Sequence, residues 1–204
     1  MMLSAEARWF WRGAPPAPFE EWFLASSAFK TAAAGGDTRC DRYLRAPSRV
    51  DLGIKQRGSG GVEIKGLIAR GQGSLNLANL HAPAETWAKW SARTLDLSGM
   101  PLLPVGKKRW LRTFRPVGGD MREVSGADNG KEPDGVVDCQ AELGKLTAPD
   151  ESIWWTFGFE AHGALGEIER ILEKTVADAA ARAPPPLPSA SPANYPAWLS
   201  SQAW

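Results

Sequence analysis

Four charged side chains share one face of a β-hairpin predicted for residues 51–67, and their types and spacing are suited to chemistry. They are Lys55, Arg57, Glu63 and Lys65, and apolar residues alternate with them along both predicted strands. Glycine-rich residues 58–61 form the turn. Successive side chains of a strand point to opposite sides, so the charged residues lie together. That face is either solvated surface or the lining of a binding channel, and composition alone does not decide between them.

Charged residues occupy matching positions on other predicted strands. Alternating patterns predict strands at residues 6–12, 38–44, 104–116, 136–147 and 152–161. Their polar faces include Arg39, Glu142 and Glu160. The strand at 104–116 is the most basic, and the sequence leaves open which of its cations face that side: Lys107 and Arg109, or Lys108 and Arg112.

A sheet with one wet face is the ordinary explanation for such a pattern. Closing the sheet into a barrel would instead place these side chains in a polar interior, where unpaired charges are costly unless a charged ligand or a metal ion meets them. Basic groups would hold phosphate oxygens, and carboxylates would hold Mg²⁺ or Mn²⁺, which prefer oxygen ligands. The mixture of long basic and acidic groups on nearly every strand favours this second interpretation.

The remaining segments supply helices, loops and a tail. Helices are predicted at residues 19–25, 83–95 and 165–182, the second from the spacing of Trp87 and Trp90. Residues 71–79 and 118–134 read as loops, and residues 33–37 as a flexible break. We expect one domain over residues 1–183, followed by a proline-rich tail at 184–204 that docks in part through its aromatic residues.

Composition excludes several classes of protein. The chain has 204 residues, of which 43% are hydrophobic, and its formal charge of +1 argues against a general nucleic-acid binder. It has no apolar run as long as a membrane span, and residues 1–12 lack a leader pattern, so a cytoplasmic protein without membrane partners is expected. Cys40 and Cys139 are too few for a disulfide framework, and we expect both to be buried thiols.

Common catalytic signatures are missing from the sequence. It contains no GxxxxGK[ST] loop, GxSxG elbow, HExxH helix or GxGxxG turn. His81 and His162 are the two histidines, and their Gly-, Pro- and Ala-rich flanks predict exposed loop positions rather than a triad or a zinc site.

The order of segments resembles the CYTH family, also called triphosphate tunnel metalloenzymes. The matching motifs, in chain order, are RCDRYL, GIKQR with VEIKG, KKRWLRTF, CQAEL and FGFEA, with NYPAWL as a closing segment. The resemblance covers nearly the whole chain, and each motif by itself is short. It implies an α+β fold in which an eight-stranded antiparallel closed barrel with flanking helices encloses a triphosphate.

The resemblance also assigns roles to residues. The ligand would be a phosphate-rich small molecule such as a nucleoside triphosphate, tripolyphosphate or polyphosphate. Its predicted contacts are Arg39, Lys55, Arg57, Lys65, Lys107 and Arg109. The predicted ligands of Mg²⁺ or Mn²⁺ are Glu6, Glu63, Glu142 and Glu160. Of these, Glu142 and Glu160 would be the catalytic residues of a triphosphate hydrolase.

The first strand departs from the family pattern ExExK. Glu6 keeps the first carboxylate, but Arg8 stands where the second belongs and Phe10 replaces the lysine. A guanidinium repels a metal ion, so metal affinity should fall. We therefore weigh a phosphate-binding protein without turnover against an active hydrolase. Two alternatives stay open: a non-catalytic domain that binds a protein partner through the aromatic tail (Tyr195, Trp198 and Trp204), and an open-faced α+β sheet without a tunnel.

Overall fold

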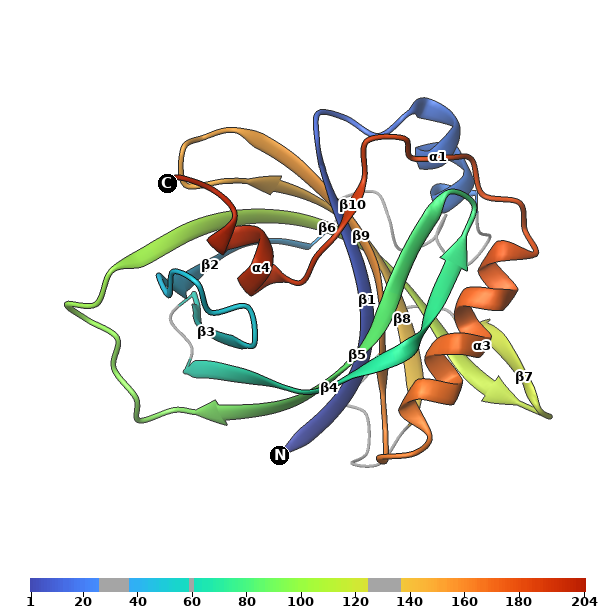
Figure 1. The fold of residues 1–204 in the computed structure, drawn as a ribbon, viewed down its shortest axis with the longest axis horizontal. Coiled ribbons are helices and arrows are strands. Elements are labelled where there is room, and N and C mark those ends of the chain that lie inside the picture. Colours follow the sequence, from blue (N-terminus) through green and yellow to red (C-terminus); the bar gives the residue numbers. More distant parts are fainter. Residues whose placement is uncertain (26–36, 59–60, 125–136) are drawn as a thin grey trace.

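The computed structural model describes residues 1–25, 37–58, 61–124 and 137–204. The described residues form a long, strongly curved sheet with two helices on one side and a third, short helix at the carboxyl end of the chain (Figure 1). None of the helices in these ranges is long and apolar enough to cross a bilayer.

Eight antiparallel strands close into a barrel. Around the ring they are β1 (Met2–Arg12), β5 (Leu80–Ala92), β4 (Val62–Leu77), β3 (Leu52–Arg57), β2 (Asp37–Leu44), β6 (Leu102–Val117), β8 (Asp138–Thr147) and β9 (Ile153–His162). β1 closes the ring, because it pairs with β5 through residues 2–6 and with β9 through residues 4–12. The expected closed barrel is confirmed, and the open-faced sheet is wrong.

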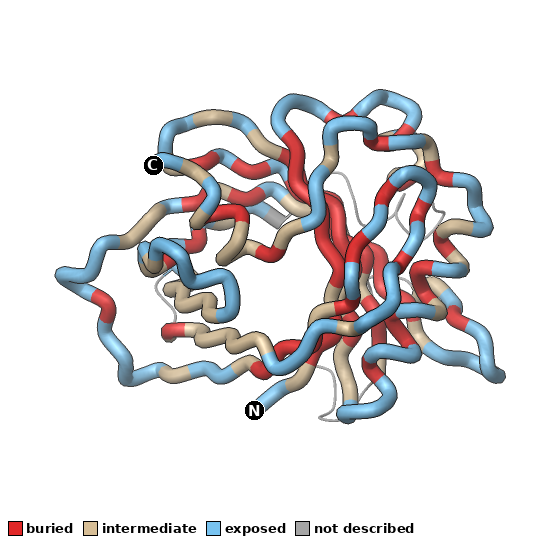
Figure 2. Tube along the Cα trace, in the orientation of Figure 1, coloured by how far each residue is buried: buried red, intermediate tan, exposed pale blue. Residues whose placement is uncertain are grey.

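The main hydrophobic core lies outside the barrel, between the wall and two helices. α1 (Ala17–Leu24) packs Phe19 and Phe23 against Phe157 of β9, and α3 (Ile168–Ala180) contacts β4, β9, β1 and β8 (Figures 1 and 2). Trp9 of β1 is buried in this core, while its neighbours in sequence, Arg8 and Phe10, point to the other side of the strand. The alternation predicted for residues 6–12 therefore places the charged face inside the barrel.

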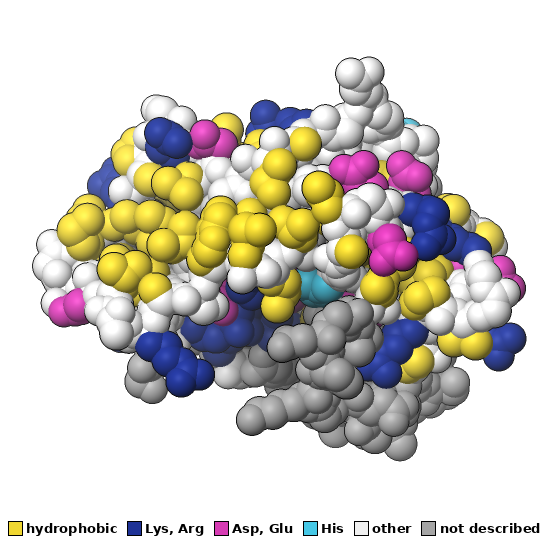
Figure 3. All heavy atoms as spheres, turned by 90° about the horizontal axis from the view of Figure 1, so that it is seen from below, with side chains coloured by type: hydrophobic (Ala, Val, Ile, Leu, Met, Phe, Trp, Pro, Cys, Tyr) yellow, Lys and Arg dark blue, Asp and Glu magenta, His cyan; other side chains and the backbone are white. Residues whose placement is uncertain are grey.

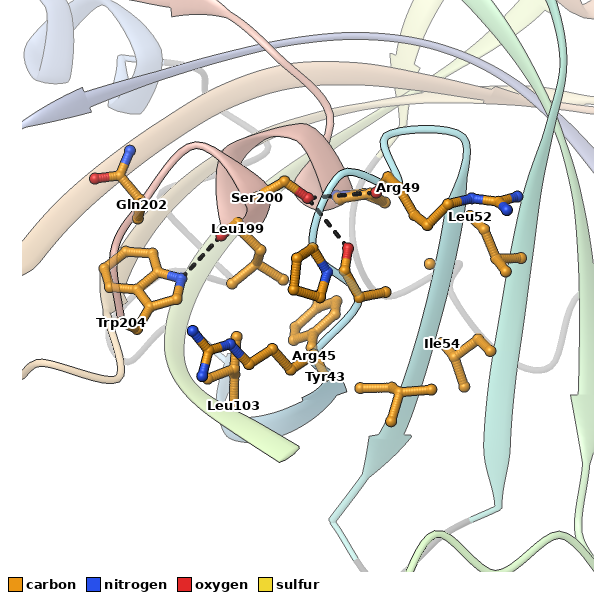
Figure 4. A pocket seen from close by; sticks show the side chains of 15 residues that line it. Tyr43, Arg45, Arg49, Leu52, Ile54, Leu103, Leu199, Ser200, Gln202 and Trp204 are labelled. Carbon is orange, nitrogen blue, oxygen red and sulfur yellow. Dashed lines mark hydrogen bonds between the residues drawn. The ribbon is translucent and has the colours of Figure 1, made fainter. Parts of the chain in front are cut away.

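The carboxyl-terminal tail closes one end of the barrel. After β10 (Ser191–Pro192), which pairs with β1, the chain forms α4 (Tyr195–Ser200), which lies within the ring of strands in Figure 1. Trp198 stacks on Phe10 with a centroid separation of 5.0 Å. The Ser200 hydroxyl donates to the backbone carbonyls of Ala46 and Arg49, both at 3.4 Å (Figure 4). The tail thus docks on its own barrel.

Two of the predicted elements are wrong. Residues 83–95 are not a helix, since β5 runs through Leu80–Ala92, and residues 71–79 are not a loop, since β4 extends to Leu77. The turn between them lies at Ala78 and Asn79, with Ala78 at a φ of 51°. Apolar residues alternate on both sides of this turn, and the tryptophan spacing in β5 imitates a helical pattern by coincidence.

Three smaller expectations are met only in part or lie outside the described residues. Residues 118–134 are not all loop, because β7 (Asp120–Val124) pairs with β6. Cys139 is buried as expected, but Cys40 is exposed, because it lies on the outward side of β2. The expected break at 33–37, part of the hairpin turn and the rest of 118–134 fall largely outside the described residues.

Candidate functional site

The barrel encloses a cavity of about 360 Å³ with charged walls. Every strand of the ring contributes to it, and the tail contributes Asn194, Tyr195 and Pro196. Basic side chains dominate the lining: Arg8, Arg39, Lys55, Arg57, Lys65, Lys89, Lys107 and Arg109. The acidic side chains of the lining are Glu6, Glu63, Glu142 and Glu160.

All ten residues predicted as ligand, metal or catalytic contacts line this cavity. The structure also decides the orientation that the sequence left open on β6. Lys107 and Arg109 face inward, whereas Lys108 is exposed and Arg112 pairs with Glu123 at 2.7 Å, away from the cavity. The roles of these residues stay predictions, but their common location is a property of the barrel.

A buried carboxylate, Asp41, anchors the cations at the tail end of the cavity. It is fully buried, and Lys55, Lys107 and Arg39 each lie 3.2 Å from one of its oxygens. Burial acts to raise the pKa of Asp41, but these three cations outweigh it and hold the pKa well below its ordinary value. Burial lowers the pKa values of Lys107 and Lys55, because both ammonium groups are removed from water.

Two tyrosines enclose the ammonium group of Lys107. It donates to the hydroxyl of Tyr43 at 2.6 Å and lies 3.6 Å from the ring centroid of Tyr195. The two rings stack on each other with centroids 5.6 Å apart. The tail therefore contributes a side chain to the charged site as well as closing it, and a cation against an aromatic face is held favourably.

A second carboxylate, Glu142, lies between two arginines near the middle of the cavity. Arg8 donates to its Oε1 at 2.7 Å and Arg109 donates to its Oε2 at 3.0 Å. Burial acts to raise the pKa of Glu142, but Arg8 and then Arg109 lower it to about 2. Glu142 is consequently ionised at neutral pH, and both of its oxygens are occupied.

Glu63 pairs with three cations on the wall formed by β3, β4 and β5. Lys55 and Arg57 lie 3.2 Å from its Oε2, and Lys89 lies 3.7 Å from its Oε1. Burial acts to raise the pKa of Glu63, but these cations lower it. The side chain of Arg57 is 42% exposed, so it is the most solvent-accessible member of this group.

The far end of the cavity carries a chain of alternating charges. Lys65 bonds to both Glu6 and Glu160, the latter at 3.1 Å. His162 follows, with its Nε2 at 3.4 Å from Glu160 and its Nδ1 at 3.2 Å from Asp138. Burial acts to lower the pKa of His162, but hydrogen bonds to Asp138 and Glu160 raise it to about 9, so the imidazole is protonated at neutral pH.

The carboxylates do not fit a divalent ion in this arrangement. Each of the four lining glutamates is already bonded to at least one lysine or arginine. Glu6 and Glu160 lie opposite each other in the β1–β9 register, but the Lys65 ammonium bridges them. Within the described part of the chain, no three His, Cys, Asp or Glu side chains are grouped to hold a metal ion.

Sequence reasoning missed several residues of the site. The helix predicted for residues 83–95 does not place Lys89 in the site, whereas on β5 both Lys89 and Trp87 face the cavity. Asp41 shares a strand face with Arg39 and was left out of the predicted site. His162 is not an exposed loop residue, because it ends β9 and faces the cavity. Assigning residues 80–92 as a strand identifies Lys89 as an inward-facing residue. The alternation along residues 38–44 places Asp41 on the same face as Arg39.

A scan of the chain against models of known protein families gives no match, and a search of curated proteins gives none at a significant level. The resemblance to the CYTH family therefore stays a prediction that rests on the order of the motifs. The closed antiparallel barrel that this resemblance implies is present.

Proposed function

We propose that this protein binds a compact polyanion with several phosphate groups inside the barrel. One observation carries the proposal: eight basic side chains line the cavity, against four lining carboxylates and Asp41 behind them. Cations that are removed from water are costly unless anions meet them. A multiply charged phosphate ligand would supply the missing negative charge, and lysine and arginine bind phosphate oxygens well.

The size of the cavity fits a small ligand. Its volume of about 360 Å³ lies at the lower end of the range for small-molecule sites, about 300 to 1,000 Å³. A short chain of phosphates suits such a site better than a folded nucleic acid. The proposed contacts are the predicted residues Arg39, Lys55, Arg57, Lys65, Lys107 and Arg109, to which the barrel adds Lys89.

The geometry supports binding more than hydrolysis. Glu142 is held between two arginines and has a low pKa, so it is a poor proton acceptor. Glu160 is bonded to Lys65 and His162. Glu142 thus has an arginine on each of its oxygens, and both contacts of Glu160 are made by its Oε1. Binding is therefore the proposal, and turnover is an outcome to measure.

Calorimetric titration with tripolyphosphate tests the proposal. We expect one ligand per chain and an affinity that falls as salt rises, because salt screens charge attraction. Lys107→Gln should weaken binding by about tenfold or more, as expected for one charge-assisted contact. Lys108→Gln is the matched control, since Lys108 is the next residue of β6 and is exposed.

Three results would change the conclusion. Failure of tripolyphosphate and ATP to bind at any salt concentration would overturn the proposal for these phosphates. Equal losses of tripolyphosphate affinity in Lys107→Gln and Lys108→Gln would show that the ligand binds on the exterior of the barrel. Release of phosphate from the bound ligand, measured on the same sample, would extend the function to hydrolysis.

A protein-interaction role is the second candidate, and one observation favours it. Hydrophobic side chains form a band across the face seen from below (Figure 3). Exposed apolar residues on β4 and β5 include Ile68 and Trp90, whose exposed fractions are 53% and 44%. The aromatic tail does not supply such a surface, because Trp198 is buried against the barrel. Sedimentation of the purified protein alone tests whether this band drives self-association; a monomer at all concentrations would count against that use.

A further inference from the structure

Arg8 reaches across the barrel wall from β1 to β8. The strand registers place Arg8, Gly158 and Glu142 in one row across β1, β9 and β8. The guanidinium of Arg8 bonds to Glu142 at 2.7 Å and to the hydroxyl of Thr156 at 3.3 Å. The side chain therefore spans the neighbouring strand and ends against the carboxylate on the strand beyond it.

Gly158 makes this path available. A Cβ atom at position 158 would lie 3.1 Å from both Cβ and Cγ of Arg8 and 2.8 Å from the carbonyl oxygen of Ala7. Such contacts are too close to tolerate without a shift. The absence of a side chain at Gly158 thus leaves the channel in which the aliphatic part of Arg8 lies.

The guanidinium is held from further sides in a buried position. The Arg8 side chain is 8% exposed, and its guanidinium carbon lies 5.2 Å from the ring centroid of Tyr195. Burial acts to lower the pKa of Arg8, but Glu142 outweighs it and raises the pKa. Arg8 is therefore a fixed positive charge on the cavity wall.

A divalent ion would have to break several charge-assisted bonds to bind here. At Glu142 it would meet Arg8 and Arg109, which hold both oxygens, and between Glu6 and Glu160 it would meet the Lys65 ammonium, which bridges their Oε1 atoms. It would also approach a buried guanidinium of the same sign, and like charges at short range repel strongly in a site of low dielectric. Arg8 supplies the kind of charge that a metal ion would otherwise bring to a phosphate ligand.

We infer that the barrel binds its phosphate ligand without a divalent metal ion, and that Arg8 takes over the neutralisation of ligand charge. This inference rests on the proposed function. It has a consequence for solutions that contain Mg²⁺: the ion complexes polyphosphate and removes charge from it, so Mg²⁺ competes with the protein for the ligand.

Titration of the wild-type protein with tripolyphosphate tests the inference directly. One sample contains EDTA and the other contains Mg²⁺ in excess over the ligand. We expect binding in EDTA and a weakening of about tenfold or more in Mg²⁺. Binding in Mg²⁺ but not in EDTA would overturn the inference and leave the proposed function intact. Absence of binding in both samples would instead overturn the proposed function.

Variants of Arg8 give a second, independent readout. Arg8→Gln removes the charge and should weaken tripolyphosphate binding in EDTA by about tenfold or more. Arg12→Gln is the control, because Arg12 lies on the same strand and parity but its side chain is 62% exposed. If Arg8→Gln binds as tightly as the wild type, Arg8 does not neutralise ligand charge.

Binding of Mn²⁺ to the protein in the absence of phosphate provides the last readout. Arg8→Glu places a carboxylate beside Glu142 and near Glu6, so this variant should bind Mn²⁺, detected as loss of the free-ion electron paramagnetic resonance signal. The wild type should leave the Mn²⁺ signal unchanged. Mn²⁺ binding by the wild type at micromolar concentrations would overturn the inference. Should Arg8→Glu fail to fold, the wild-type titration and Arg8→Gln still decide the question.

Discussion

The two ends of the charged cavity differ in how far their charges are removed from water. At the tail end, the side chains of Asp41 and Lys107 are 0% and 2% exposed. At the far end, Lys65 is 27% and Glu160 is 25% exposed. Strand register separates the two ends: Phe10, which packs on the tail, pairs with Thr156, whereas His162 lies six residues farther along β9.

The exposure of each ion determines how strongly it depends on its partners. At the tail end, each ion lacks water, so it relies on its partners and loses much when one of them is removed. At the far end, water solvates part of each charge, so a substitution should change the pH dependence of stability and ligand binding more than the stability itself. We expect ligands to enter from the far end, because the tail covers the other.

Asp41→Asn should have the largest effect on stability. The substitution leaves the buried Lys107 and Lys55 without the carboxylate that both contact at 3.2 Å. We expect the free energy of unfolding to fall by about 3 to 5 kcal/mol, the usual cost of breaking a buried ion pair from one side. Urea unfolding followed by tryptophan fluorescence measures it.

Asp51→Asn is the matched control for this prediction. Asp51 also pairs with an arginine, Arg49 at 2.9 Å, but both side chains are more than half exposed. The control should be indistinguishable from the wild type. Tripolyphosphate should restore part of the stability of Asp41→Asn, since it offers the cations another anion. Equal stabilities of the two variants would contradict the contrast between buried and exposed charges.

At the far end, His162 should make the stability of the protein depend on pH. The pKa of His162 is about 9 in the folded protein, above the ordinary value of about 6.5. Its stabilising contribution is therefore complete below pH about 6.5 and is lost as pH rises through about 9. The contribution is at most about 3 kcal/mol, reduced by the partial exposure of the ring.

Urea unfolding of the wild type and His162→Gln at pH 6, 8 and 10 measures this contribution. The difference between the two proteins should shrink as pH rises. His81→Gln serves as the control, because His81 lies on β5 away from the charged cavity. Stability curves of the wild type and His162→Gln that run parallel from pH 6 to 10 would show that His162 is not the titrating group.

The sequence predicted the barrel interior well because strand parity is a local property. Alternation along residues 52–57 and 62–65 decides which side chains share a face, and pairing of Ile54 with Ile64 keeps those faces together. Parity cannot decide whether a sheet closes. That step depends on β1 pairing with both β5 and β9, which are far from each other in sequence.

The failures have physical causes of another kind. Trp87 and Trp90 are three residues apart, which suits one helix face, yet on β5 they lie on opposite sides: Trp87 lines the cavity and Trp90 is exposed. Pro83 also suggested a helix start, but it lies in the β4–β5 hairpin extension, where β5 has left β1 and only β4 pairs with it. The ion-pair partners depend on distances across the barrel, which no local pattern encodes.

The smallest effects should separate the two tyrosines at the tail end. Tyr43→Phe removes the hydroxyl that accepts a hydrogen bond from Lys107 at 2.6 Å, and should lower the free energy of unfolding by about 1.5 to 3 kcal/mol. Tyr195→Phe removes a buried hydroxyl for which the described residues offer no hydrogen-bond partner, and should change it by less than about 0.5 kcal/mol. Both variants keep the aromatic faces around Lys107, so urea unfolding compares the hydroxyl groups alone. If Tyr195→Phe proves as costly as Tyr43→Phe, the tail holds Lys107 through more than its ring.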